Sequence, residues 1–223
     1  MSEGSPRWDL RLAVAGAAVV VVGGGTVAGL RLTAGPPPPA FASAPVDGFS
    51  LHGAKAPGFT LVDQFGRTTS LSQFRGKEVV WAFIDDQCTT DCPITAEALR
   101  GAVASLGPAA KGVQLVAVNA NPTATSVAQV RKWSAEHQML HQWEFLTGTR
   151  AQLEKVYASY KVSDQVSGQG SAATIFHDPA VIVIDPSGRE RLYYETLPTN
   201  ASTTVRAEIK GWARGMRQWL PST

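Results

Sequence analysis

Beyond residue 57, the hydrophobic and polar positions of the chain alternate between strand-like and helix-like segments. Three short runs are almost wholly apolar, which is typical of strands covered on both faces; they are residues 78–84, 113–119 and 180–185. Apolar residues recur at helical spacing in four longer segments, residues 93–106, 125–137, 149–160 and 203–220. This alternation predicts a mixed α/β sheet with helices packed on it.

Turn residues predict two hairpins in addition. Residues 57–63 and 68–71 flank a turn at Gly66, and Pro186-Ser187-Gly188 separates the apolar run 180–185 from residues 189–195. Glycine, proline and serine between two strand-like segments favour a tight reversal of the chain. We therefore expect a short opening hairpin and a second hairpin near the end of the sheet.

The amino-terminal region has a different pattern. Residues 12–30 contain no charged side chain over nineteen positions, and a helix of that length spans roughly 28 Å, close to the hydrocarbon thickness of a bilayer. A cleaved signal peptide is the alternative, but the Ala-x-Ala sequences at 40–44 lie ten or more residues beyond the apolar run, farther than cleavage sites usually do. We predict a retained transmembrane helix over residues 12–31.

The segments around this helix predict its orientation and a spacer. Arg7 and Arg11 in the tail 1–11 precede it, and Arg31 follows it, so the bias of basic residues places the tail inside and the rest outside. Residues 32–56 contain four consecutive prolines, which form a stiff extended spacer. We expect a single-pass protein of the cell membrane whose domain, residues 57–223, lies on the extracytoplasmic side.

Composition and charge narrow the functional classes. Hydrophobic residues make up 44% of the 223-residue chain and charged residues 17%, enough for a buried core. Lys and Arg number 20 against 18 Asp and Glu, without a basic run, so we expect no nucleic-acid partner, because phosphate binding needs concentrated positive charge. Two cysteines exclude a disulfide scaffold and any four-cysteine site within one chain.

These two cysteines carry the candidate chemistry. Cys88 and Cys92 form a C-x-x-x-C motif between the strand-like run 78–84 and the helical segment that we expect to begin at Pro93. The positive end of a helix lowers thiol pKa values and makes the sulfurs better ligands and nucleophiles. A purely structural disulfide would close so short a loop that it would remove little entropy from the unfolded chain. We interpret the pair as a functional dithiol.

A histidine would complete a soft metal site with these sulfurs. Two sulfurs and an imidazole suit Cu(I), although zinc also accepts them. The sequence offers His52, His137, His141 and His177. We expect the first three on the surface; His177 precedes the apolar run 180–185 and would face the dithiol if that strand ran antiparallel to 78–84. The residues alone leave its role as a ligand open.

Several motifs, taken together and in order, resemble the Sco/SenC family of membrane-tethered, thioredoxin-fold copper chaperones for cytochrome c oxidase. The resemblance covers roughly residues 57–195. The matching positions are Phe59, Leu61, Asp63, Gly66, Ser70 and Leu71, then Phe74-Arg75-Gly76-Lys77, Cys88 to Pro93, Phe145 to Gly148, Tyr160-Lys161-Val162, and His177 with the following strand.

The resemblance implies a thioredoxin-like fold with an amino-terminal anchor and a specific site. By position, Cys88, Cys92 and His177 would bind one copper ion, most simply Cu(I), and pass it to the copper-acceptor subunit of cytochrome c oxidase. The alternative is a membrane-anchored thiol-disulfide oxidoreductase that uses Cys88 and Cys92 to reduce a partner's cysteines. Pro179, where thioredoxin-like folds often have a cis-proline, keeps that alternative open.

The chain also departs from the family pattern. Thr89 stands where the family usually has a proline, and residues 119–122 read Asn-Ala-Asn-Pro instead of an acidic segment. Neither change affects the three expected ligands. The second one removes negative charge that would tune docking to a partner.

Overall fold

The computed structural model describes residues 48–162, 164–167, 174–177, 180–195 and 202–220. The predicted tail 1–11, the predicted transmembrane helix 12–31 and most of the predicted tether lie outside these ranges. Among the helices that the structure does describe, none combines the length and the apolar character needed to cross a bilayer.

A six-stranded mixed sheet forms the centre of the folded unit, in the order β1-β10-β9-β4-β5-β6. Its strands are β1 (Phe49–Ser50), β4 (Glu78–Ile84), β5 (Val113–Asn119), β6 (Trp143–Leu146), β9 (Ala180–Ile184) and β10 (Glu190–Glu195). Strands β4, β5 and β6 run parallel, whereas β9 is antiparallel to β4 and β10 antiparallel to β9. The mixed α/β prediction is confirmed, together with the hairpin that ends the sheet.

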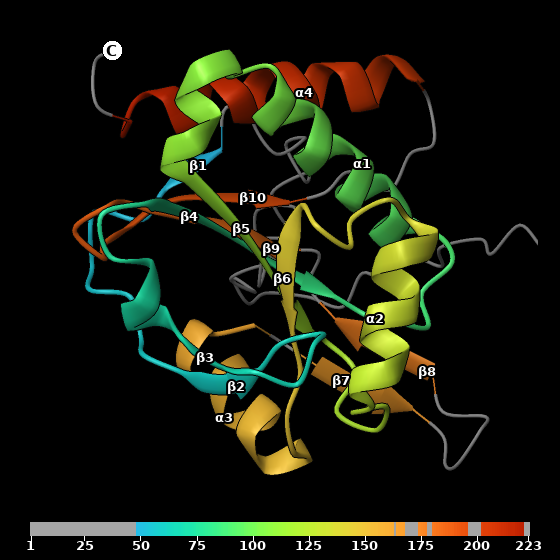
Figure 1. The fold of residues 1–223 in the computed structure, drawn as a ribbon. Helices are drawn as coiled ribbons and strands as arrows, with labels where there is room; N and C mark the ends of the chain where they lie inside the picture. Colours follow the sequence, from blue (N-terminus) through green and yellow to red (C-terminus); the bar gives the residue numbers. More distant parts are fainter. Residues whose placement is uncertain (1–47, 163, 168–173, 178–179, 196–201, 221–223) are drawn as a thin grey trace, which may run out of the picture. The chain divides into compact units, whose positions relative to one another are not determined.

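Four helices cover this sheet. They are α1 (Asp91–Ala104), α2 (Val127–Glu136), α3 (Arg150–Tyr160) and α4 (Ser202–Arg217), with short 3-10 turns η1 (Leu71–Phe74) and η2 (Gly107–Gly112). In Figure 1, α1 and α4 lie together above the sheet and α3 lies below it. All four predicted helices are present, and their observed ends differ from the predicted ends by up to three residues.

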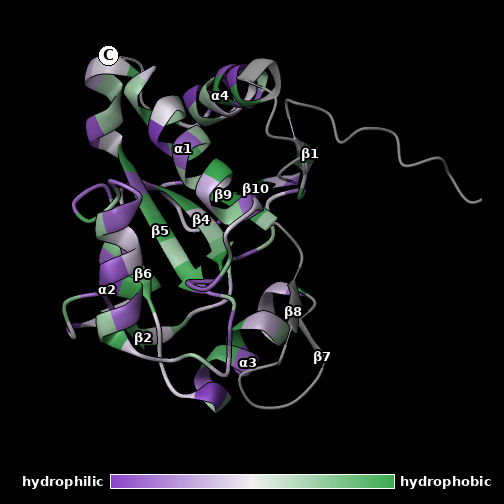
Figure 2. Ribbon diagram, turned by 90° about the vertical axis from the view of Figure 1, so that its right-hand side faces the viewer, coloured by the Kyte–Doolittle hydropathy of each residue, from purple (hydrophilic) through white to green (hydrophobic). Residues whose placement is uncertain are grey.

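Two hydrophobic cores follow from this layering, one on each face of the sheet. Successive residues of a strand point to opposite faces: Ala82 of β4 packs in the core with Leu99 of α1 and Trp212 of α4, and Trp81 packs in the core with Leu153 of α3. The central strands appear green, that is hydrophobic, between helices that are partly purple in Figure 2. Coverage on both faces explains why β4 and β9 are continuous apolar runs.

Strand β6 and two separate hairpins complete the described chain. Strand β6 was not predicted; it is a four-residue edge strand that pairs with β5. The predicted opening hairpin is present as β2 (Thr60–Val62) and β3 (Thr68–Ser70). A second pair, β7 (Asp164–Ser167) and β8 (Thr174–His177), was not predicted, and it makes His177 the last residue of a strand instead of a loop residue.

The end of the predicted tether contacts the sheet. Phe49 and Ser50 pair with Tyr193 and Leu192 of β10, and the backbone N–H of Ala56 donates to the carbonyl of Gly188 at 3.0 Å. Residues 49–56, which we expected in the tether, are therefore part of the folded unit.

Candidate metal and redox site

Cys88 and Cys92 lie where β4 gives way to α1. The strand ends at Ile84, and a turn begins in which the backbone N–H of Cys88 donates to the carbonyl of Asp85 at 3.1 Å. Helix α1 starts at Asp91, two residues earlier than predicted, so Cys92 is its second residue. Pro93 is the third, still within the first turn, where a backbone N–H has no partner inside the helix.

The two sulfurs differ in exposure and are in direct contact. Cys92 is buried, with 2% of its surface exposed, while Cys88 is half-buried. The backbone N–H of Cys92 donates to Sγ of Cys88 at 3.4 Å, and the hydroxyl of Thr90 lies 3.6 Å from the same sulfur. Both cysteines are free thiols. The structure thus brings the two predicted cysteines together as an accessible thiol and a buried one.

The pKa values of the two thiols shift in opposite directions. A hydrogen bond from the Cys92 thiol, together with backbone N–H groups of Cys92 and Thr90, lowers the pKa of Cys88 to about 4, although burial opposes this change. The hydrogen bond to Cys88 and burial raise the pKa of Cys92. The expectation that the helix end would lower both pKa values is therefore wrong for Cys92, because this thiol is the donor and is removed from water.

Asn121 joins the cysteine turn to the neighbouring strand. Its side-chain amide donates to Asp85 Oδ1 at 3.2 Å and to Gln87 Oε1 at 3.4 Å. Its carbonyl oxygen accepts hydrogen bonds from the backbone N–H groups of Thr123 and Ala124. In the sequence, the Asn-Ala-Asn-Pro segment was distinctive only as a departure from the family pattern. Because the parallel strands β4 and β5 end at the same edge of the sheet, the residues that follow β5 could have been expected to contact the cysteine turn that follows β4.

Asp86 lies in the same turn, and both of its carboxylate oxygens are buried. Neither oxygen has a hydrogen-bond partner among the described residues. Burial, followed by the charge of Asp85, raises the pKa of Asp86 to about 7. Below this pH the side chain is mostly neutral, so it adds little negative charge next to the Cys88 thiolate.

Strand β9 determines where His177 can lie. Because β9 is antiparallel to β4, with Val181 opposite Ala82, the amino end of β9 is at the edge where β4 leads into the cysteine turn. His177 precedes Ala180 by three residues, so its Cα lies within about 11 Å of the Cα of Ala180. The antiparallel arrangement that a ligand at position 177 requires is present, but the side chain of His177 is outside the described part of the structure, as is Pro179.

The other histidines lie elsewhere. His137 packs on Trp133 with ring centroids 4.0 Å apart, and His141 stacks on the exposed ring of Phe65. His52 is exposed near β1. No group of three histidine, cysteine or acidic side chains suited to a metal occurs among the residues whose side chains the structure describes. Those residues supply two of the three predicted ligands.

Comparison with known proteins identifies a matching protein family and solved structures with a similar fold. The family model described as SCO1/SenC matches residues 50–214. The copper-bound structure of Bradyrhizobium japonicum ScoI is 21% identical, covering 75% of this chain and 100% of that one, with a TM-score of 0.62.

Two further solved structures are similar. One is BsSco, a member of the Sco family of cytochrome c oxidase assembly proteins in which a disulfide switch was identified; it is 20% identical, covers 73% of this chain and 95% of its own, and has a TM-score of 0.54. The other is the thioredoxin domain of a thiol-disulfide oxidoreductase from Bacteroides vulgatus, 20% identical over 76% of this chain and 97% of that one, with a TM-score of 0.53. These likenesses confirm a thioredoxin-like fold.

Proposed function

Since the chain belongs to the SCO1/SenC family, we propose that it is a copper-binding chaperone that delivers copper to, or matures, the copper centre of cytochrome c oxidase. The observation that carries this proposal is the pair of adjacent thiols, Cys88 and Cys92, at the start of α1. The antiparallel β9, which follows His177, supports the third ligand position.

The donor set suits a single Cu(I) ion. Two thiolates and a neutral imidazole from Cys88, Cys92 and His177 are soft ligands, and their net charge with Cu(I) is −1. Cys88 is deprotonated at neutral pH, whereas Cys92 is protonated until a metal arrives. Copper binding therefore releases one proton, from Cys92, and the apparent affinity rises about tenfold per pH unit near neutrality.

Transfer to the acceptor follows from the unequal exposure of the two sulfurs. Cys88 is half-buried and Cys92 is buried, so an incoming sulfur or nitrogen of the copper-acceptor subunit reaches the metal from the side of Cys88. It replaces that thiolate first, and Cys92 regains its proton when it leaves the metal. Oxidation to a Cys88–Cys92 disulfide removes two ligands, which couples copper affinity to redox state.

Cu(I) titration of the reduced full chain against a chromophoric chelator tests this function. We expect one ion per chain, and a loss of affinity of at least about 100-fold in each of Cys88→Ser, Cys92→Ser and His177→Ala, because each removes a ligand. His141→Ala is the matched control, because His141 is exposed and stacks on Phe65; this variant should bind like the unmodified protein. Equal binding by His177→Ala and His141→Ala would reject His177 as a ligand.

A second candidate function is thiol-disulfide exchange on a partner protein, favoured by the low pKa of the accessible Cys88. The Cys88 thiolate attacks a partner disulfide, forming a mixed disulfide and releasing one partner thiolate. Cys92 then loses its proton and attacks the Cys88 sulfur, so that the partner leaves with two reduced cysteines and this chain holds a Cys88–Cys92 disulfide. His177→Ala separates the two functions, because it should abolish tight copper binding and leave single-turnover disulfide reduction intact.

We also propose that residues 12–31 anchor the chain in the cell membrane, with the folded unit on the extracytoplasmic side. The support is the uncharged run of residues 12–30 and the basic residues before it. The expected result is that the chain sediments with membranes after a salt wash and that protease added outside intact spheroplasts removes the folded unit. A domain protected until the membrane is lysed would show the opposite orientation.

A further inference from the structure

A cavity of about 250 Å³ opens at the amino end of β4, the end opposite the cysteines. Three segments enclose it: residues 55–58 after β1, the η1 turn with the residues that follow it, and the β9–β10 turn. The residues that line it include Lys55, Phe74, Arg75, Lys77, Val79 and Ile184. The dithiol does not contribute to it.

The floor of this cavity is apolar. Ala56, Phe74, Val79 and Ile184 all belong to the buried core, with exposed fractions between 1% and 6%. Because these side chains have little surface left in water, a ring of suitable size gains mainly dispersion contacts with them as it fills the cavity.

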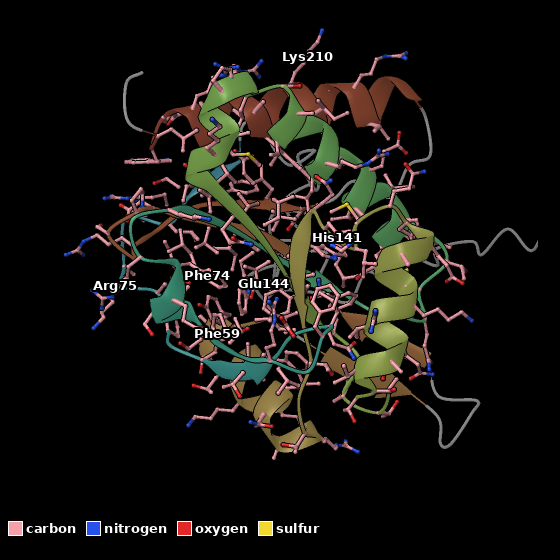
Figure 3. The ribbon with its side chains drawn as sticks, viewed as in Figure 1. Phe59, Phe74, Arg75, His141, Glu144 and Lys210 are labelled. Atoms are coloured by element: carbon pink, nitrogen blue, oxygen red, sulfur yellow. The ribbon has the colours of Figure 1, made fainter. Side chains whose placement is uncertain are left out.

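The rim of the cavity is positively charged. Lys55, Arg75 and Lys77 line it and are exposed, and within the described chain none of them forms an ion pair. Figure 3 shows Arg75 at the edge of the molecule, whereas its neighbour Phe74 points toward the interior. The cavity therefore combines three cations with a hydrophobic floor.

The single carboxylate that lines the cavity is already neutralised. Asp185 forms an ion pair with Arg191 at 2.7 Å and accepts hydrogen bonds from Ser187 and the backbone N–H of Arg189. It does not compete with a ligand for the three cations, so an anionic group entering the cavity meets net positive charge.

We propose that this cavity binds a small organic anion of the aryl carboxylate class, with its apolar body on Phe74, Val79 and Ile184 and its charged group beside Arg75 and Lys77. The site is independent of the proposed copper function, because it lies at the other end of β4 and shares no residue with the dithiol.

Photolabelling of the full chain in neutral detergent with 4-azidobenzoate, followed by peptide mapping, tests the proposal. We expect the label in peptides containing residues 55–58, 71–77 or 184–188, and competition by benzoate. Acetate, which lacks the ring, and benzyl alcohol, which lacks the charge, should each compete at least about tenfold more weakly, because one loses the apolar contact and the other the charged one. Labelling spread over the chain, or equal competition by benzyl alcohol, would overturn the proposal.

Variants locate the site. Arg75→Gln combined with Lys77→Gln should reduce labelling at least fivefold, and Ala56→Leu, which fills the floor, should also reduce it. Lys210→Gln is the matched control, because Lys210 is exposed on α4 and lies far from Arg75 in Figure 3. Since Ala56 is buried, the two exposed substitutions decide the outcome: unchanged labelling in that double variant contradicts the site. Cys88→Ser should label like the unmodified protein, so failure of this proposal and failure of the copper function are distinguishable.

Discussion

The pKa values of buried ionisable groups shift in opposite directions at the two ends of strand β4. Beyond its carboxyl end, the pKa of Cys88 is lowered to about 4 and the thiol is ionised. At its amino end, Glu78 is completely buried, and its carboxylate oxygens have no hydrogen-bond partner among the described residues. Burial, followed by the charge of Asp185, raises the pKa of Glu78 to about 8, so the side chain is neutral at pH 7.

The difference shows that hydrogen-bond donors, and not the degree of burial alone, decide which buried group is charged. Burial raises the pKa of both Cys88 and Glu78. At Cys88 the effect of burial is outweighed by the Cys92 thiol and by N–H groups at the start of α1, whereas at Glu78 no donor from the described residues compensates for the lost water. The first turn of α1 therefore determines where the proposed redox and metal chemistry would take place.

The largest expected effect is a difference in reactivity between the two thiols. At pH 6 the Cys88 thiolate is almost fully formed, while Cys92 is protonated and buried. We expect iodoacetamide to modify Cys88 roughly 1,000-fold faster than Cys92, because the thiolate is the nucleophile. The Cys88 rate should be constant from pH 6 to 8 and fall as the pH drops through about 4. Quenched alkylation and peptide mass spectrometry measure both rates.

Cys92→Ala is the control for this assignment. It removes the first cause of the low pKa of Cys88, so the pH midpoint of Cys88 alkylation should move up. An unchanged midpoint would mean that the neighbouring thiol does not stabilise the Cys88 thiolate.

The burial of Glu78 at the amino end of β4 predicts a contribution to the free energy of unfolding that is lost at high pH. Folded Glu78 holds its proton up to about pH 8, whereas the unfolded chain releases it near 4.5. The contribution of Glu78 to the free energy of unfolding is thus complete below pH 4.5, is lost as the pH rises toward 8, and then levels off, a loss on the order of 4 kcal/mol. Glu78→Gln should remove this contribution, so the change in the free energy of unfolding between pH 5 and pH 9, measured by denaturant titration, should differ by that amount between the variant and the unmodified protein.

Glu97→Gln is the matched control, because Glu97 is exposed on α1. It should keep the pH dependence of the unmodified protein. If Glu78→Gln and Glu97→Gln lose stability equally between pH 5 and pH 9, the decline does not come from Glu78.

The comparison also shows what the sequence could predict. Strands covered on both faces can be predicted from the sequence because they are continuous apolar runs. Strands β4 and β5 match the predicted runs 78–84 and 113–119 in full. Strand β6 was not predicted because four residues at a sheet edge are too few to show a hydrophobic pattern, and because its pairing with β5 depends on tertiary contacts. The β7–β8 hairpin was not predicted for a similar reason.

At the site, the sequence predicted the cysteine pair and its place before a helix, but not how the two thiols divide their roles. That division depends on α1 starting at Asp91, which buries Cys92 and directs its N–H to Cys88. The particular hydrogen bond from Asn121 to Asp85 could not be predicted, because the ends of β4 and β5 come together only in the folded chain. The role of His177 rests on the resemblance and stays a prediction.

A smaller effect is expected from Asn121, which supports the cysteine turn beyond the carboxyl end of β4. Asn121→Ala removes hydrogen bonds to Asp85 and to the backbone of Thr123 and Ala124, so the free energy of unfolding should fall by about 2 kcal/mol. Gln87→Ala is the control, because exposed Gln87 makes one long contact of 3.4 Å with Asn121; it should cost less than about 0.5 kcal/mol. Equal losses, measured by urea unfolding, would remove Asn121 from the support of the cysteine turn.

Thr90 should give the smallest effect. Its hydroxyl lies 3.6 Å from the Cys88 sulfur and ranks last among the groups that lower the pKa of Cys88, because sulfur is a weak acceptor at that distance. Thr90→Val keeps the shape of the side chain and removes the donor, so the pH midpoint of Cys88 alkylation should rise by about half a pH unit, equivalent to about 0.7 kcal/mol. Thr89→Val, at the exposed neighbouring position, should leave the midpoint unchanged. If Thr90→Val moved the midpoint as far as Cys92→Ala does, the hydroxyl and not the buried thiol would be the main stabiliser of the thiolate, and the pairing of the two cysteines would lose its electrostatic basis.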